Sequence, residues 1–326
     1  MSSSNLIVII GGTGAQGGSV ISALQGNKSY RIRAVTRNAS SEKAKALSAK
    51  GVEVVTADVG DVESLKRAFE GATAIFANTD FYATFAKSGA EVALKTEYLQ
   101  GKNLADAASS TPTLTHYIWS TIPSASALSG GKYVVPHFEG KAQTDEYITS
   151  SCPELAKKTT FLWIGFYGTN LKYYTFAPFF VPSAGKYVSM WPVPGDTPIE
   201  TAGLVDVNIG LFVSSILSQP QLTQPAKYVF LRTEVLSVRE LWEMLAEVKG
   251  TKVENVQVKQ EDFNRVWPGM GEEMGVMLRF WSDVREKGWT RKDGGKVLMG
   301  EDLGVRGVVG QRETFEGQDW GEVLKR

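Results

Sequence analysis

The stretch Leu6-Ile-Val-Ile-Ile-Gly11-Gly-Thr-Gly-Ala-Gln-Gly-Gly18 joins an apolar run to a glycine-rich turn. A continuous apolar run such as Leu6–Ile10 is typical of a strand buried on both faces of a parallel sheet. After such a strand, glycines spaced G-x-G-x-x-G allow a tight turn, a close backbone approach to a pyrophosphate and close packing of the next helix. Two overlapping sets fit, Gly12, Gly14 and Gly17, and, as G-x-x-G-x-x-G, Gly11, Gly14 and Gly17.

The turn also opens a helix, which places free N–H groups and the positive end of the helix dipole at the turn. An anionic pyrophosphate binds well in that position. We therefore predict a dinucleotide-binding turn; the alternative is an ordinary flexible loop. The expected contacts are Gly11, Gly12, Thr13, Gly14, Ala15, Gln16 and Gly17.

Outward from this turn, strand-like and helix-like segments alternate as far as residue 165, which predicts βαβ units and a Rossmann-type doubly wound parallel sheet. The expected strands are Leu6–Ile10, Tyr30–Thr36, Val52–Thr56, Ala74–Ala77, His116–Ser120 and Thr160–Gly165. The first expected helix begins near Gln16. The later ones span Glu42–Ala49, Val62–Phe69, Ala90–Ala108 and Glu139–Thr149.

The pattern changes after Tyr167, where aromatic residues, proline and glycine interrupt the repeat. We expect residues 1–165, joined by 205–235, to form the cofactor-binding domain. Residues 166–204 and 236–326 are expected to form a smaller α+β domain on the substrate or partner side. Within it, Ser237 and Glu240 have the spacing of a capping box and predict the start of a helix.

The end of the second strand distinguishes between cofactors. NAD-binding domains usually carry an acidic residue about 20 residues beyond the glycines, where it bonds the ribose 2′-hydroxyl. This chain has Arg37 there, which favours the 2′-phosphate of NADP(H); a plain surface arginine is the alternative. Asp58, after the third strand, is expected either to contact the adenine or to cap the following helix.

Composition excludes several classes of function. The 35 basic and 35 acidic residues leave no net charge to neutralise a nucleic-acid backbone, so we expect no direct DNA or RNA binding. One cysteine and two histidines argue against a metal site, and no apolar run reaches the length of a membrane span. Residues 1–5 lack the pattern of a signal peptide. We expect a cytoplasmic protein, with the nucleus as a second location.

Several motifs together resemble the NmrA-like family of atypical short-chain dehydrogenases/reductases. The resemblance covers nearly the whole chain and becomes vaguer after about residue 250. It rests on residues 11–20 followed by Val35-Thr-Arg-Asn38, Gln100-Gly-Lys-Asn-Leu-Ala-Asp106, Pro136-His-Phe-Glu-Gly-Lys141, Tyr167-Gly-Thr-Asn-Leu171 and Gly195-Asp-Thr-Pro198. The family contains NADPH sensors, fungal nitrogen-repression regulators and oxidoreductases of secondary metabolism.

The resemblance implies an NADP(H) cofactor and a set of contacts along the chain. Besides the glycine turn, Arg37 and Asp58, the implied contacts are Thr79, Asp80, Phe81, Lys141, Tyr167, Gly168, Thr169 and Asn170. The segment from Thr79 to Phe81 follows the fourth strand, at the edge of the sheet where open α/β sheets bind ligands.

The candidate catalytic residues depart from the usual pattern. Ordinary short-chain dehydrogenases use a Tyr-x-x-x-Lys pair, but here His137 stands four residues before Lys141. Three interpretations remain open: His137 donates the proton; Lys141 acts alone or through the ribose and a water; or both residues are structural. Ser120 or Thr121, at the end of the fifth strand, would supply the hydroxyl that positions a carbonyl.

Two functions therefore compete. The first is an NADPH-dependent oxidoreductase that reduces a small aromatic or polyketide-like molecule. The second is a non-catalytic NADP(H)-sensing regulator that acts through a protein partner, and a homodimer is also open. An aromatic set is expected to line a substrate cleft or to form core: Phe166, Tyr167, Tyr173, Tyr174, Phe176, Phe179, Phe180 and Trp191. Trp267, Trp281 and Trp289 are expected in the core of the smaller domain.

Overall fold

A large parallel sheet organises the chain. The structure, a computed structural model, describes residues 5–324, so the expectation for the first residues of the chain lies outside it. Eight strands pair in the order β13-β10-β6-β5-β4-β1-β2-β3. They are β1 (Asn5–Ile10), β2 (Tyr30–Thr36), β3 (Glu53–Thr56), β4 (Ala74–Ala77), β5 (His116–Thr121), β6 (Thr159–Ile164), β10 (Lys227–Leu231) and β13 (Val297–Leu298). The predicted Rossmann-type sheet is confirmed.

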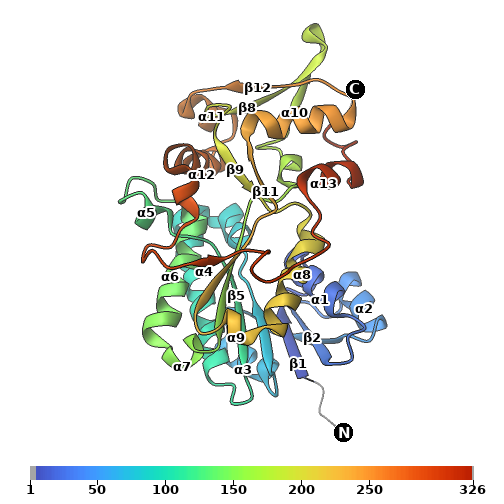
Figure 1. The fold of residues 1–326 in the computed structure, drawn as a ribbon, viewed down its shortest axis with the longest axis vertical. Helices are drawn as coiled ribbons and strands as arrows, with labels where there is room; N and C mark the ends of the chain where they lie inside the picture. Colours follow the sequence, from blue (N-terminus) through green and yellow to red (C-terminus); the bar gives the residue numbers. More distant parts are fainter. Residues whose placement is uncertain (1–4, 325–326) are drawn as a thin grey trace.

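Helices cover both faces of this sheet (Figure 1). One face packs on α1 (Ala15–Leu24) and α8 (Val205–Ser218), through residues such as Val20 and Ile209. The other face packs on α3 (Val62–Phe69), α4 (Phe81–Ser109) and α6 (Pro136–Ser151). The shorter helices around the sheet are α2 (Glu42–Ala49), α5 (Ala125–Leu128), α7 (Pro153–Ala156) and α9 (Pro220–Thr223).

The long helix α4 begins nine residues earlier than the pattern predicted. Asp80 caps it by accepting a hydrogen bond from the Ala83 N–H, and the helix then breaks at Gly89, where φ is +78°. A left-handed backbone interrupts the helical repeat, so the pattern identified only the part after the kink. The early start matters because it places the first turn of α4 at the carboxyl edge of β4.

A smaller unit lies beyond the carboxyl edge of the large sheet, above it in Figure 1. Its strands form two small sheets, β12-β8-β7 and β11-β9. They are β7 (Phe179–Val181), β8 (Lys186–Trp191), β9 (Pro198–Thr201), β11 (Glu234–Ser237) and β12 (Val253–Gln257). Its helices are α10 (Val238–Lys249), α11 (Gln260–Val266), α12 (Met270–Val284) and α13 (Gln311–Gly317).

The capping box at the start of α10 is present: Ser237 accepts from the Glu240 N–H, and the Glu240 carboxylate accepts from the Ser237 N–H. Two distant segments extend the large sheet, since β10 pairs with β6 and β13 pairs with β10. The first lies within residues 205–235, and the second within the range expected for the smaller domain. The domain boundaries themselves stay a prediction.

Candidate functional site

The glycine turn between β1 and α1 has the geometry that its spacing predicted. Gly11 has φ of +66°, a backbone conformation that residues with a side chain rarely adopt. A Cβ on Gly17 would lie 2.4 Å from the Gly11 carbonyl oxygen, and one on Gly12 would lie 2.7 Å from the Ala34 Cβ. Glycine is therefore required at these positions for the turn to close against β2 and for α1 to begin so near the strand.

The start of α1 is open to an anion. Gly14 is the N-cap residue, no side chain caps the helix, and the first turn contains no acidic residue. The first N–H groups of a helix lack partners inside the helix, so those after Gly14 remain available. This cradle of backbone donors at a positive helix end fits the pyrophosphate of a dinucleotide.

Gln16 connects the turn to two other strand ends. Its amide donates to the Tyr167 hydroxyl over 2.7 Å, and its carbonyl oxygen accepts from the Asn78 amide over 3.4 Å. Burial raises the pKa of Tyr167 to about 12, so the phenol stays protonated. Tyr167 and Asn78 follow β6 and β4, so three carboxyl ends of the sheet meet at this glutamine.

Arg37 and Asp58 lie at the ends of β2 and β3, where the sequence placed them. Arg37 is exposed and has no ion pair within residues 5–324, so its guanidinium is available to an anionic group. Asp58 accepts from the Gly60 N–H over 2.8 Å. The alternative that it caps the following helix is wrong, because Asp61 accepts from the Glu63 N–H and is the N-cap of α3.

Lys141, on α6, points to the end of β4. Its Nζ donates to the Thr79 hydroxyl over 2.7 Å and to the Thr79 carbonyl over 3.3 Å. The Glu97 carboxylate of α4 lies 3.1 Å from Nζ and accepts from the Thr79 hydroxyl over 2.8 Å. Only 1% of the Glu97 side chain is exposed, so a buried carboxylate balances the charge of Lys141.

His137, one turn before Lys141 on α6, pairs with α12. Its Nδ1 lies 2.5 Å from Glu273 Oε1, and its backbone N–H donates to the same oxygen over 3.1 Å. The Glu273 side chain is 1% exposed and that of His137 is 13% exposed. This arrangement fixes the orientation of the imidazole ring through Nδ1, and Nε2 is the ring nitrogen that Glu273 does not contact. We call Thr79, Glu97, His137, Lys141 and Glu273 the polar corner.

Ser120 does not face the polar corner. Its neighbours in β5, Trp119 and Thr121, both donate to Asp145 Oδ1 on α6, over 2.9 and 2.7 Å. Because successive side chains of a strand alternate, Ser120 faces the opposite side of the sheet, as Ile118 does. The structure thus brings Thr121 to the α6 side, and a substrate contact by Ser120 stays a prediction.

The remaining predicted contacts lie along the same edge of the sheet. Asp80 caps α4 and Phe81 is buried in its first turn. The Gly168 carbonyl accepts from the buried Gln311 side chain, which ties the loop after β6 to α13. Thr169 and Asn170 continue that loop into a short 3₁₀ helix.

Comparison with known proteins identifies the family. Residues 3–298 match the family model described as the NmrA-like family. The chain belongs to the NmrA-like family. The oxidoreductase cpsB of Aspergillus campestris is 30% identical, over 67% of this chain and 66% of that protein. An NmrA-like family domain-containing protein of Dictyostelium discoideum is 24% identical, over 99% of this chain and 98% of its own length.

Solved structures show the same fold. NmrA, a negative transcriptional regulator in complex with NADP, has a TM-score of 0.73 at 22% identity, over 98% of this chain and 99% of that chain. The Citrobacter sp. triphenylmethane reductase complexed with NADP(H) has a TM-score of 0.67 at 19% identity, over 95% of this chain and 99% of that chain. At these identities the likeness concerns the fold alone.

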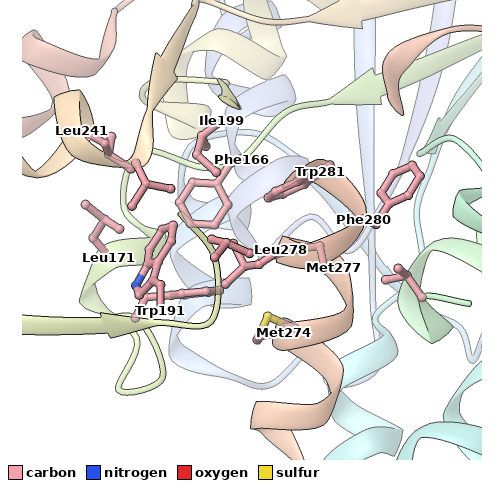
Figure 2. Close-up of a cluster of buried hydrophobic side chains, with 14 of the residues drawn as sticks. Phe166, Leu171, Trp191, Ile199, Leu241, Met274, Met277, Leu278, Phe280 and Trp281 are labelled. Carbon is pink, nitrogen blue, oxygen red and sulfur yellow. The ribbon is translucent and has the colours of Figure 1, made fainter. Parts of the chain in front are cut away.

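Part of the aromatic set in this NmrA-like protein is core. Phe166, Phe176 and Trp191 are buried and pack against one another, with ring centroids 5.3–6.3 Å apart. Figure 2 shows Phe166 and Trp191 among buried side chains of the smaller unit, near Trp281. These three residues cannot line an open cleft. Trp281 and Trp289 are core as expected.

Four other aromatic residues of this set are exposed. Tyr173 is 63% exposed and Tyr174 is 57% exposed, and Tyr174 contacts the half-buried Trp267 with ring centroids 5.5 Å apart. Phe179 and Phe180 are also exposed, on β7. The aromatic stretch of sequence therefore divides between core and surface.

Tyr82 is an aromatic residue of the site that no motif indicated. It lies in the first turn of α4, with its ring 5.7 Å from that of His137. Burial raises the pKa of the Tyr82 phenol well above its ordinary value, and the charges of Glu273 and Glu97 add to the effect. Tyr82 as a whole residue is nevertheless 41% exposed.

Glu97, Glu273 and Asn78 were also missed by the sequence motifs. A capped start of α4 directly after β4 would have indicated Tyr82, but nothing local indicates which carboxylate will face Lys141.

Two cavities, of about 490 and 280 Å³, lie in the smaller unit around Gln257, and neither is lined by a residue of the glycine turn or the polar corner. Within residues 5–324, no helix meets the length and apolarity of a membrane span, and no acidic, histidine or cysteine cluster forms a metal site.

Proposed function

We propose that this NmrA-like protein is an NADPH-dependent oxidoreductase that reduces a small uncharged aromatic or polyketide-like molecule. One observation carries the proposal: an open glycine cradle and a lysine held by hydrogen bonds lie at the same carboxyl edge of one parallel sheet. Relatives named as oxidoreductases and structural neighbours crystallised with NADP or NADP(H) support it. These comparisons support an NAD(P)-dependent oxidoreductase or an NmrA-type regulator.

In this proposal the cofactor spans the sheet edge from β2 to α6. The N–H groups after Gly14 bind the pyrophosphate, Arg37 pairs with the 2′-phosphate, and Asp58 meets the adenine side. Lys141 reaches the nicotinamide ribose, beside the segment from Thr79 to Phe81. The loop of Tyr167, Gly168, Thr169 and Asn170 closes the site from the end of β6.

Bound NADPH supplies a hydride to an electrophilic carbon of the substrate. Where that carbon belongs to a carbonyl group, the carbonyl oxygen then needs a proton, which His137 Nε2 or a water ordered by Lys141 would donate. Glu273 serves this role by holding the His137 ring through Nδ1. The exposed residue Tyr82 gives the substrate an aromatic surface beside these groups.

Single-turnover oxidation of bound NADPH, followed at 340 nm against a panel of carbonyl and enone compounds, tests this function. The wild type oxidises NADPH with at least one compound, and Lys141→Ala and His137→Ala slow the hydride step while keeping the fold. If the wild type oxidises none, or if both variants oxidise at the wild-type rate, the proposed mechanism is wrong.

A second candidate function is an NADP(H)-sensing regulator. The observation that favours it is the His137–Glu273 pair, because it ties α6, which bears Lys141, to α12 of the smaller unit. Cofactor bound at Lys141 would thereby alter the surface of the smaller unit for a protein partner. Tight NADPH binding without any oxidation in the single-turnover assay supports this candidate over the enzyme.

A further inference from the structure

Glu97 lies buried beneath Lys141 and belongs to no motif of the chain. We propose that Glu97, acting with the Thr79 hydroxyl, is a positioning residue that aims the Lys141 ammonium at the nicotinamide ribose of NADP(H). The inference rests on the proposed function, since it requires NADP(H) at this edge of the sheet. It adds a residue whose effect reaches the cofactor only through Lys141.

The hydrogen bonds define which groups donate. The Thr79 hydroxyl has one proton, which it donates to Glu97 Oε1 over 2.8 Å, so it accepts from Lys141 over 2.7 Å. Lys141 donates a second proton to the Thr79 carbonyl over 3.3 Å. No hydrogen bond within the described residues uses the third ammonium proton, although Glu97 lies 3.1 Å away as its charge partner. The ammonium also lies over the Trp119 ring, 5.4 Å from its centroid. In the proposal, a ribose hydroxyl accepts the third proton.

Close helix packing places the carboxylate. A Cβ on Gly140 would lie 3.0 Å from Glu97 Oε2, and one on Gly101 would lie 2.2 Å from the Thr144 hydroxyl. Both glycines therefore let α4 and α6 approach closely, which brings Glu97 under Lys141. The second carboxylate oxygen, Oε2, is buried and has no hydrogen-bond partner among the described residues.

Such a carboxylate is expensive for the fold. A buried carboxylate with an unsatisfied oxygen costs free energy, and a buried ion pair is often no more stabilising than an apolar pair. A purely structural pair is the competing explanation, and it predicts a loss of stability without selectivity among ligands. The two explanations differ in which part of the cofactor the residue affects.

A pair of ligands separates them. NADPH contains the nicotinamide ribose, whereas adenosine 2′,5′-bisphosphate contains only the adenosine end. Isothermal titration of both ligands is carried out on the full chain, on Glu97→Gln, and on the control Glu91→Gln. Glu91 is an exposed carboxylate on the same helix, paired with Lys95 over 2.7 Å. The control therefore makes the same chemical change on α4 at an exposed position that contacts neither Lys141 nor Thr79 in the recognised hydrogen bonds and ion pairs.

We expect Glu97→Gln to weaken NADPH binding about tenfold or more, as the loss of a charge-assisted contact does. Binding of the bisphosphate should change by less than about twofold, and Glu91→Gln should change neither. Equal losses for both ligands, or no loss for either, would overturn the positioning role while leaving the proposed function intact. A wild type that binds neither ligand defeats the proposed function and the inference with it.

Thr79 provides a second test if Glu97→Gln does not fold. Thr79→Val removes the hydroxyl and keeps the shape, whereas Thr79→Ser keeps the hydroxyl. The inference predicts selective weakening of NADPH binding in the valine variant and near wild-type binding in the serine variant. Equal NADPH affinities for the two variants contradict it.

Discussion

The glycine turn and the polar corner lie at the same edge of the sheet but are built in different ways. The turn uses backbone groups within the seven residues from Gly11 to Gly17, so residue spacing alone determines its geometry. The corner uses side chains from three helices, α4, α6 and α12, and from the segment after β4: Lys141 and Thr79 are 62 residues apart, and His137 and Glu273 are 136 apart. A site made of backbone can be read from local sequence, whereas a site made of side chains depends on packing.

The largest expected effect tests the backbone half of this contrast. In Gly17→Ala the new Cβ would lie 2.4 Å from the Gly11 carbonyl oxygen, so the turn must move. We expect a loss of about 3 kcal/mol in the free energy of unfolding, together with weaker NADPH binding. Urea unfolding and NADPH titration measure both quantities.

Gly18→Ala is the matched control. A Cβ at Gly18 would lie 3.9 Å from the Gly12 carbonyl oxygen, an ordinary contact, and alanine is favoured over glycine within a helix. We expect unchanged or slightly higher stability. If adjacent Gly17 and Gly18 variants lose the same stability, close packing at residue 17 does not determine the turn.

The next effect tests the side-chain half. Glu273→Gln removes the charge that faces His137 from α12, and we expect a loss of about 2 kcal/mol in the free energy of unfolding. Glu272→Gln, its exposed neighbour on α12, should change stability by less than about 0.5 kcal/mol. Equal effects of the two changes would show that the link between α6 and α12 is unimportant for stability.

A smaller effect concerns pH. Burial raises the pKa of Asp145, one turn after Lys141, to about 8, against hydrogen bonds from Thr121 and Trp119 that lower it. From the ordinary pKa of an aspartate up to about pH 8, the folded state keeps a proton that the unfolded state releases. Stability therefore falls as pH rises through that window, by at most about 1.4 kcal/mol per pH unit for this one group.

Asp145→Asn removes this titration. The melting temperature of the variant relative to the wild type should rise as pH increases from 5 to 9, measured by thermal unfolding in matched buffers. A difference that stays constant with pH would contradict a raised pKa for Asp145.

The sequence predicted the large sheet because its strands are apolar runs and its turn is a glycine pattern. It missed the first part of α4, since a left-handed glycine at 89 breaks the helical repeat, and it missed β13, which has only two residues. At the site, Lys141 and His137 were found through a linear motif. Glu97 and Glu273 could not be found, because their roles come from helices that meet only after folding.

NADP(H) binding at the edge formed by β1 and β2 underlies the proposed function. The most direct test is isothermal titration of NADPH and NADH on the wild type, Arg37→Asp and Arg31→Asp, the last an equal change of charge at an exposed position earlier in β2. The account predicts that Arg37→Asp weakens NADPH binding by about tenfold or more and NADH binding far less, while Arg31→Asp changes neither. Unchanged affinities for both cofactors in Arg37→Asp would contradict the account.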